Sequence, residues 1–345
     1  MKKQVLTAAV SLAVMVSTSP AQSPLKLSVA PSLSTHRGET EYIMDIRQTL
    51  TDESGNIIYD PTGSPVVWRL KSQLEFPLDV TVFGVTARVD LTSNPGFFWV
   101  EGSYFLSLND PSGALTDSDW EGLSGYVDFT KFSYTESEAT MESRAFDIEA
   151  GVRLLTPGKV SVAAVAGYRY QKIQQDVIGF DGWFRVFDTV ALAFSDEQYS
   201  QSGTGKVGYY EITYKQPQVG LVTWIDWRPG LSTRIKTVYT PVWFEDYDDH
   251  VLRFKEAIAD GDGSGFIGSA RIHYELTQAP MPAVPFVDFT AEFVTLSASG
   301  KQTQSWYDDD PASPDFDETG LSIPGLPHEV NSTQFDFGLR IGVTF

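Results

Sequence analysis

Long runs in which apolar and polar residues alternate are the feature that most constrains the fold of this chain. In the clearest run, every second residue from Phe335 to Phe345 is apolar, and the positions between them carry Asp, Gly, Arg and Thr. Residues 144–154 and 269–276 have the same period. A period of two places successive side chains on opposite faces of a β-strand. The sequence therefore predicts an all-β fold whose strands have one apolar and one polar face.

The length and the charge of these runs distinguish a membrane barrel from a soluble sandwich. Strands of soluble proteins have about five to six residues, whereas a tilted strand needs about 9–11 residues to cross a membrane. The runs at 144–154 and 335–345 are long enough to do so, and their polar faces carry full charges, including Glu149, Arg153 and Arg340. A wet barrel lumen tolerates such charges, but a packed sandwich core does not. We therefore predict a transmembrane up-and-down antiparallel β-barrel.

Two kinds of connection alternate along the chain. The short ones contain proline and lie at 92–96, 156–158, 228–230 and 278–283. The long polar ones lie near 50–65, 111–142, 181–205, 247–264 and 300–331. This alternation is typical of short periplasmic turns and long extracellular loops, and five long loops imply about ten strands. We expect these strands at 27–48, 66–91, 97–112, 143–155, 159–180, 206–227, 231–246, 265–277, 284–299 and 332–345. Within 66–91 the apolar positions change from even to odd past Phe83, which predicts a bulge.

The N-terminus has the features of an exported protein. Residues 1–21 contain a charged start at Lys2 and Lys3, an apolar stretch at 5–16 and a small-residue end at 19–21, which predicts a signal peptide. The apolar stretch is too short to cross a bilayer as a helix. Residues 22–345 are expected to form a single barrel domain, and the terminal aromatic Phe345 is typical of the Gram-negative outer membrane.

The composition limits the partners of this chain. Its formal net charge of −20 excludes nucleic acid, because phosphate binding needs clustered Lys and Arg. Two interpretations of the charge remain open, namely a solvated acidic surface and a surface that attracts basic substrates. The absence of cysteine removes disulfide and thiol chemistry.

Two acidic segments with the same spacing are the candidate functional residues. Asp246, Asp248 and His250 are two residues apart, so an extended strand would place them on one face, and Asp117 and Asp119 would form a matching acidic face. A carboxylate beside an imidazole is a common general base. The pair of Asp117 and Asp119 and the pair of Asp248 and His250 lie in predicted long loops and hence at the same extracellular mouth. A metal site is less favoured, because such sites usually draw on a further His or Cys ligand, and we expect no metal.

These segments resemble the omptins, which are outer-membrane proteases of Gram-negative bacteria. Asp117-Ser118-Asp119-Trp120 is similar to the family's Asp-x-Asp-Trp segment, and residues 246–250 are similar to its Asp-x-Asp-x-His segment. The resemblance implies an endopeptidase without metal or covalent intermediate. Asp248 and His250 would activate a water that is held by Asp117 and Asp119. We expect one of these two aspartates to be protonated, since adjacent carboxylates resist joint ionisation.

The resemblance also implies partners. Asp246 would bind a Lys or Arg side chain beside the cut, with Glu41 as its acidic partner, so cationic peptides or proteins are the expected substrates. Tyr168 and Lys172 resemble part of a lipopolysaccharide-binding segment, which makes this outer-membrane lipid a candidate activator. No other cofactor is expected, and we expect a monomer.

A non-enzymatic barrel is the alternative function. An adhesin, a porin-like protein or an inactive omptin-like scaffold would share the same strand pattern. A porin has no need for carboxylates and His250 at two-residue spacing, and about ten strands leave a lumen that is too narrow for efficient conduction. The sequence therefore favours the protease.

Overall fold

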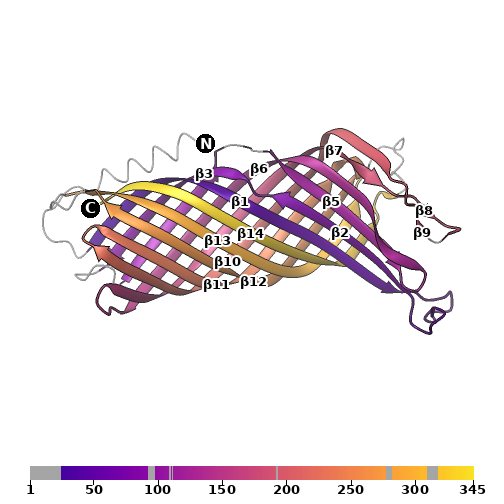
Figure 1. The fold of residues 1–345 in the computed structure, drawn as a ribbon, viewed down its shortest axis with the longest axis horizontal. Coiled ribbons are helices and arrows are strands. Elements are labelled where there is room, and N and C mark those ends of the chain that lie inside the picture. The colour runs from indigo at the N-terminus through magenta and orange to yellow at the C-terminus, as the bar shows by residue number, and fades with distance from the viewer. Residues whose placement is uncertain are drawn as a thin grey trace.

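The chain forms one closed antiparallel β-barrel in a computed structural model (Figure 1). The structure describes residues 25–91, 98–108, 110, 112–191, 193–276, 282–308 and 318–345. The expected signal peptide and the connection at 92–96 lie outside these residues, as does most of 278–283. The barrel strands are β1 (Leu25–Thr49), β2 (Val67–Pro77), β3 (Val80–Leu91), β4 (Phe98–Ser107), β5 (Ser112–Leu123), β6 (Val127–Leu155), β7 (Val160–Phe184), β10 (Tyr199–Arg228), β11 (Leu231–His250), β12 (Lys255–Glu275), β13 (Val284–Trp306) and β14 (Ser322–Thr344).

Twelve strands form the barrel sheet. β2 and β3 lie end to end and together occupy one position in the ring, and β4 and β5 together occupy the next. β1 pairs with β3 over its first half and with β2 over its second half, and β6 pairs in the same way with β5 and β4. The barrel therefore has ten strand positions, and the pairing of β14 with β1 closes the ring. A small hairpin of β8 (Phe187–Asp188) and β9 (Ala193–Phe194) lies in the connection between β7 and β10. The predicted up-and-down barrel of about ten strands is confirmed.

The strands extend further at their extracellular ends than the sequence predicts. Most of the connection expected at 111–142 belongs to β5 and β6, which are joined by a turn at 124–126. Most of the connection expected at 247–264 belongs to β11 and β12. Beyond the membrane the outer face of a strand contacts water, so it needs no apolar residues. These segments therefore lack the alternation that identifies the membrane-crossing parts.

The predicted bulge near Phe83 does not exist. Lumen-facing residues keep even numbers on both sides of this position, and the break between β2 and β3 at 78–79 leaves them in phase. The chemistry of the two faces changes instead. Lumenal positions are apolar at Leu74 and Val82 but polar at Thr86, whereas the outward positions become apolar, as at Val85. This exchange marks the level at which the outer face of the barrel passes from water into lipid.

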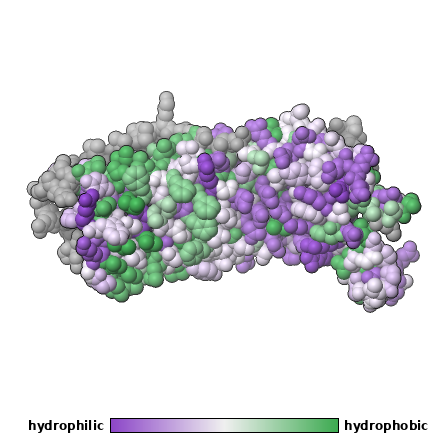
Figure 2. Space-filling model, in the orientation of Figure 1, coloured by the Kyte–Doolittle hydropathy of each residue, from purple (hydrophilic) through white to green (hydrophobic). Residues whose placement is uncertain are grey.

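Figure 2 shows apolar residues gathered over the half of the barrel where the chain ends, and polar residues over the other half. On β11 the exposed apolar side chains include Ile235, Tyr239 and Trp243, and the next outward position is Glu245. We therefore assign 231–243 to the membrane-spanning part of β11, and the end of this strand lies outside the membrane. None of the helices in the described part of the chain is long and apolar enough to cross a bilayer.

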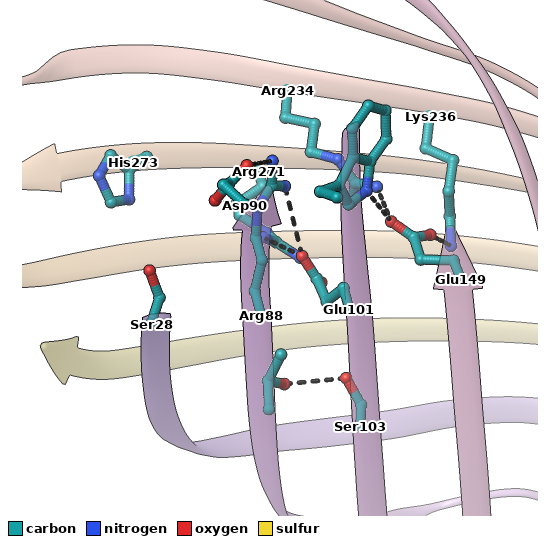
Figure 3. Close-up of polar contacts among 12 residues, drawn as sticks. Ser28, Arg88, Asp90, Glu101, Ser103, Glu149, Arg234, Lys236, Arg271 and His273 are labelled. Atoms are coloured by element: carbon teal, nitrogen blue, oxygen red, sulfur yellow. Dashed lines mark hydrogen bonds and ion pairs between the residues drawn. The ribbon is translucent and has the colours of Figure 1, made fainter. Parts of the chain in front are cut away.

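Buried ion pairs fill the lumen at the level of the membrane (Figure 3). The carboxylate of Glu149 contacts Arg234 and lies 3.1 Å from Nζ of Lys236, and all three side chains are buried. A second carboxylate, Glu101, is shared by several cations: Arg88, Arg271 and Arg340. Because these charges have one another as partners, the lumen can be both polar and closed.

We predict that Glu149→Gln destabilises the barrel far more than a matched change on its surface. The substitution leaves two buried cations without their carboxylate, and breaking a buried ion pair costs about 3–5 kcal/mol. Glu245→Gln is the control, because its pair with Lys215 at 2.5 Å is largely exposed and is worth at most about 1 kcal/mol. The measurement is the free energy of unfolding in urea, with the protein in lipid vesicles. Equal losses in the two variants would contradict a stabilising role for the lumenal network.

Candidate active site

Three residues at the extracellular end of β11 face the lumen. Asp246 and Asp248 are buried, His250 is partly exposed, and their spacing places all three on one side of the strand. Nε2 of His250 lies 2.9 Å from Oδ2 of Asp248. Burial would raise the pKa of Asp248, but the charge and the hydrogen bond of His250 lower this pKa below its ordinary value. Asp248 therefore stays ionised, and it can orient the imidazole and offset the charge of a proton that the ring takes up.

Asp117 and Asp119 occupy the facing wall on β5. They lie opposite Leu74 and Ser72 of β2, and Ser72 hydrogen-bonds to Asp119. Oδ1 of Asp117 is buried and has no hydrogen-bond partner among the described residues. This oxygen is an acceptor that a bound water or substrate could use.

The two walls meet at one cleft. Asp117, Asp248 and His250 all line one cleft that is open to solvent. Asp119 lies beside Asp117, and its carboxylate interacts electrostatically with His250. The structure thus brings both predicted halves of the site together, although they are on strands rather than in loops. In the described part of the chain, no group of three or more His, Asp and Glu side chains is placed to hold a metal ion.

The two aspartates of β5 share a site that disfavours their negative charge. Burial raises the pKa of Asp117 to about 7, and the charge of Asp119 adds to the shift. Burial also raises the pKa of Asp119, against the hydrogen bond from Ser72 and the positive charge of Arg253. Near neutral pH the pair therefore holds a proton for part of the time.

Two cations that were missing from the predicted site lie beside the acidic residues. A 3₁₀ turn, η1 (Val251–Arg253), follows β11, and Phe254 closes it in the left-handed region with φ 46°. The turn brings Arg253 and Lys255 into electrostatic interaction with the β5 aspartates. Burial lowers the pKa of Lys255. The signal in the sequence was two basic residues, Arg253 and Lys255, shortly after the Asp-x-Asp-x-His segment that ends at His250.

Asp246 lies below the cleft and is already paired. Its Oδ2 is 2.7 Å from Nε2 of His328 on β14, and the hydroxyl of Tyr210 lies 3.5 Å from the same oxygen. Burial raises the pKa of Asp246, although the hydrogen bond and charge of His328 oppose this shift. No sequence pattern singles out His328, because 82 residues separate it from Asp246.

Glu41 does not lie with Asp246. It occupies an odd-numbered position of β1, whereas the lumenal positions of this strand, such as Tyr42, are even-numbered. Glu41 is opposite Glu75 in the pairing with β2, and Nε2 of Gln73 lies 3.5 Å from its carboxylate. The predicted pairing of Glu41 with Asp246 needed a shift of one residue, and in a strand such a shift changes the face.

Tyr168 and Lys172 lie on the outer face of β7. Tyr168 is exposed, and Nζ of Lys172 contacts the carboxylate of Glu211 on β10. Gln174 donates a hydrogen bond of 2.8 Å to the same carboxylate. The expected lipid-binding positions are therefore on the correct side of the wall, but Lys172 already has an anionic partner.

Comparisons with known proteins identify the family. A model of the omptin family matches residues 48–294. Among solved structures, the outer membrane protease OmpT from Escherichia coli is 16% identical with a TM-score of 0.69, and the match covers 95% of this chain and 100% of OmpT. The outer membrane protein OprG from Pseudomonas aeruginosa is 7% identical with a TM-score of 0.28, over 93% of this chain and 95% of OprG. None of the curated proteins matches the chain.

The match to OmpT shows a shared barrel fold, whereas the match to OprG is too weak to support an argument. The family model extends over more than half of the sequence, and the predicted location in the outer membrane agrees with it. This chain belongs to the omptin family, the outer-membrane proteases of Gram-negative bacteria.

Proposed function

We propose that this barrel is an endopeptidase that cleaves peptide bonds with an activated water at its extracellular mouth. The observation that carries the proposal is the common cleft, which Asp117 lines from one wall and the Asp248–His250 pair from the other. A water between the walls would have a base on one side and acceptors on the other. All these groups come from one chain, which also supports a monomeric enzyme.

In the proposed reaction, His250 takes a proton from the water as the water oxygen attacks the scissile carbonyl. Asp248 offsets the charge of the imidazolium, as its 2.9 Å distance from Nε2 allows. The β5 aspartates hold the water, and their shared proton can be donated to a substrate oxygen. When the tetrahedral intermediate collapses, His250 gives its proton to the leaving amine, and the β5 aspartates take back any proton that they gave to the substrate oxygen, which balances the reaction.

The cations beside the cleft support the same chemistry. The carbonyl oxygen gains negative charge as water attacks, and preorganised positive groups stabilise such charge strongly in a site shielded from water. Arg253 lines the cleft, and Lys255 begins the next strand. Their positive charges also offset the negative charge of the carboxylates in the site, which reduces the repulsion among these acids when no substrate is bound.

The net charge of −20 supports cationic peptides and proteins as substrates, because an acidic mouth raises their local concentration. This attraction acts on a whole peptide. A preference for Lys or Arg beside the cut would need a carboxylate within reach of the substrate, and the family resemblance assigns this role to Asp246, which lies outside the cleft lining. We propose lipopolysaccharide as a candidate activator at the outward-facing Tyr168 and Lys172.

A non-enzymatic barrel remains the second candidate, and one observation opposes its porin-like form. The buried pairs of Glu149 and Glu101 occupy the lumen at the level of the membrane. A scaffold without activity would share every feature of the fold, so only turnover separates it from the protease.

We predict that His250→Ala lowers kcat/KM by at least about a hundredfold, which is the scale of a lost general base. The measurement uses a panel of internally quenched peptides with basic and apolar centres, and refolded protein with and without lipopolysaccharide. His273→Ala is the matched control, because His273 also contacts an aspartate, Asp288 at 2.7 Å, but lies at the other end of the barrel. Turnover that survives in the His250 variant would contradict the mechanism.

We predict that Asp117→Asn stabilises the barrel at pH 8 but not below pH 4. The pKa of Asp117 is raised to about 7 in the folded protein, so the stability that its protonated form contributes is present at low pH and is lost as the pH rises through 7. Asparagine cannot ionise, and the expected gain at pH 8 is on the order of 1–3 kcal/mol, since one pKa unit corresponds to about 1.4 kcal/mol.

The free energy of unfolding at the two pH values tests this expectation. Asp128→Asn is the control, because Asp128 is exposed on the outer part of β6. Asp117→Asn is also expected to lose activity. A gain that is the same at both pH values would show that Asp117 is not a group of raised pKa.

A further inference from the structure

We infer that the side chain this enzyme binds beside the scissile bond is apolar, because His328 and the aromatic residues around it close Asp246 off from the cleft. The inference rests on the proposed peptidase function and specifies its substrate class. It makes His328 the residue that determines specificity.

The charge of Asp246 is not available to a substrate. Oδ2 of Asp246 contacts Nε2 of His328 at 2.7 Å, and the two side chains are 1% and 0% exposed. A Lys or Arg side chain would have to displace the imidazole from a carboxylate that has no access to water. Exchange of one buried partner for another leaves the displaced group unpaired, which is strongly unfavourable.

The space around Asp246 is also filled. The ring of Tyr42 packs edge-on against His328 with 4.4 Å between centroids, and the Tyr42 hydroxyl donates a hydrogen bond to Gln302. Phe76 stacks on Tyr210 at 4.0 Å with 16° between the ring planes. We call these residues, together with Phe244 and His328, the aromatic layer. Each member is at most 3% exposed: Tyr42, Phe76, Tyr210, Phe244 and His328.

The aromatic layer meets the cleft at Phe76. Phe76 belongs to both, since one part of its surface lines the cleft and its ring covers Tyr210. Asp246 and His328 are absent from the cleft lining. A substrate side chain in the cleft can therefore reach Phe76 but not the carboxylate of Asp246.

The lining of the cleft is mainly apolar or uncharged. The apolar members are Leu74, Phe76, Leu115, Val177, Phe180, Val207 and Leu252. The hydroxyl-bearing members are Ser133, Thr135 and Ser137. The acids of the lining are the two that the reaction uses and Asp249, which accepts a hydrogen bond of 2.6 Å from Tyr307. Arg253 in the same lining would repel a cation. Burial of an apolar side chain against these walls is favourable.

The test compares two internally quenched peptides of identical, uncharged frame, one with an Arg-Arg centre and the other with Leu-Leu. For the parent protein, refolded in vesicles with lipopolysaccharide, we expect kcat/KM to be at least tenfold higher for Leu-Leu. This comparison needs no variant, so it decides the inference even if a substitution in the layer prevents folding.

His328→Ala is expected to raise kcat/KM for the Arg-Arg peptide at least tenfold, because it opens a space beside Asp246 and removes the imidazole that pairs with this carboxylate. Benzamidine, a compact amidinium, should then inhibit the variant but not the parent. The double substitution of His328→Ala and Asp246→Asn should lose both gains, and His328→Gln, which keeps the space filled, should show neither. His36→Ala is the control: its ring contacts Asp336 at 3.0 Å in the lumen and lines another cavity.

Efficient cleavage of Arg-Arg by the parent, abolished by Asp246→Asn, would overturn the inference and leave the peptidase function intact. The same holds if the parent prefers Arg-Arg and no change at His328 alters that preference. If the folded parent cleaves neither peptide nor any of the wider panel, the proposed function fails and the inference falls with it.

Discussion

The closed hydrogen-bond ring is the constraint on which the rest of this structure depends. In hydrocarbon an unpaired backbone N–H or C=O costs several kcal/mol, so the sheet must have no free edge, and the pairing of β14 with β1 removes it. Ten strand positions then fix a narrow lumen. Because side chains alternate across each strand, every second residue must point into that lumen. This geometry lets β5 and β11, which are distant in sequence, present acids to one cleft.

The kind of residue that fills the lumen changes along the barrel together with the kind of residue on the outer face. At the level of the membrane the outward positions are apolar, so the lumenal positions carry the charges, and burial forces groups such as Glu149 and Arg234 into pairs. Above the membrane the outer face is polar, and the lumen instead holds the aromatic layer around Phe244. The acids of the cleft lie on this layer. They are therefore buried enough for their pKa values to shift, while the mouth above them stays open.

The alternation made the barrel predictable from the sequence. It also predicted that Asp246, Asp248 and His250 share one face of a strand, since residues two apart in a strand lie on the same face whatever the tertiary structure. It could not give the ends of the strands, because strands outside the membrane carry polar residues on the face that is apolar elsewhere. It also failed at Glu41, where one residue of register decides between lumen and exterior, and Tyr42 takes the lumenal place. His328 was not predictable, because its contact with Asp246 exists only after strands 82 residues apart curve around the same lumen.

β11 carries both the proposed base, His250, and Asp246, which is closed off from the cleft. The period that points Asp248 toward His250 in the cleft sends Asp246 one step deeper, into the aromatic layer. A carboxylate at that depth must be either paired within the protein or matched by a ligand, because it cannot stay charged and unpaired. Here β14 supplies the partner through His328. A barrel of this kind can therefore change the side chain it accepts by filling one lumenal position on a strand that contributes nothing to the chemistry, while both catalytic walls stay as they are.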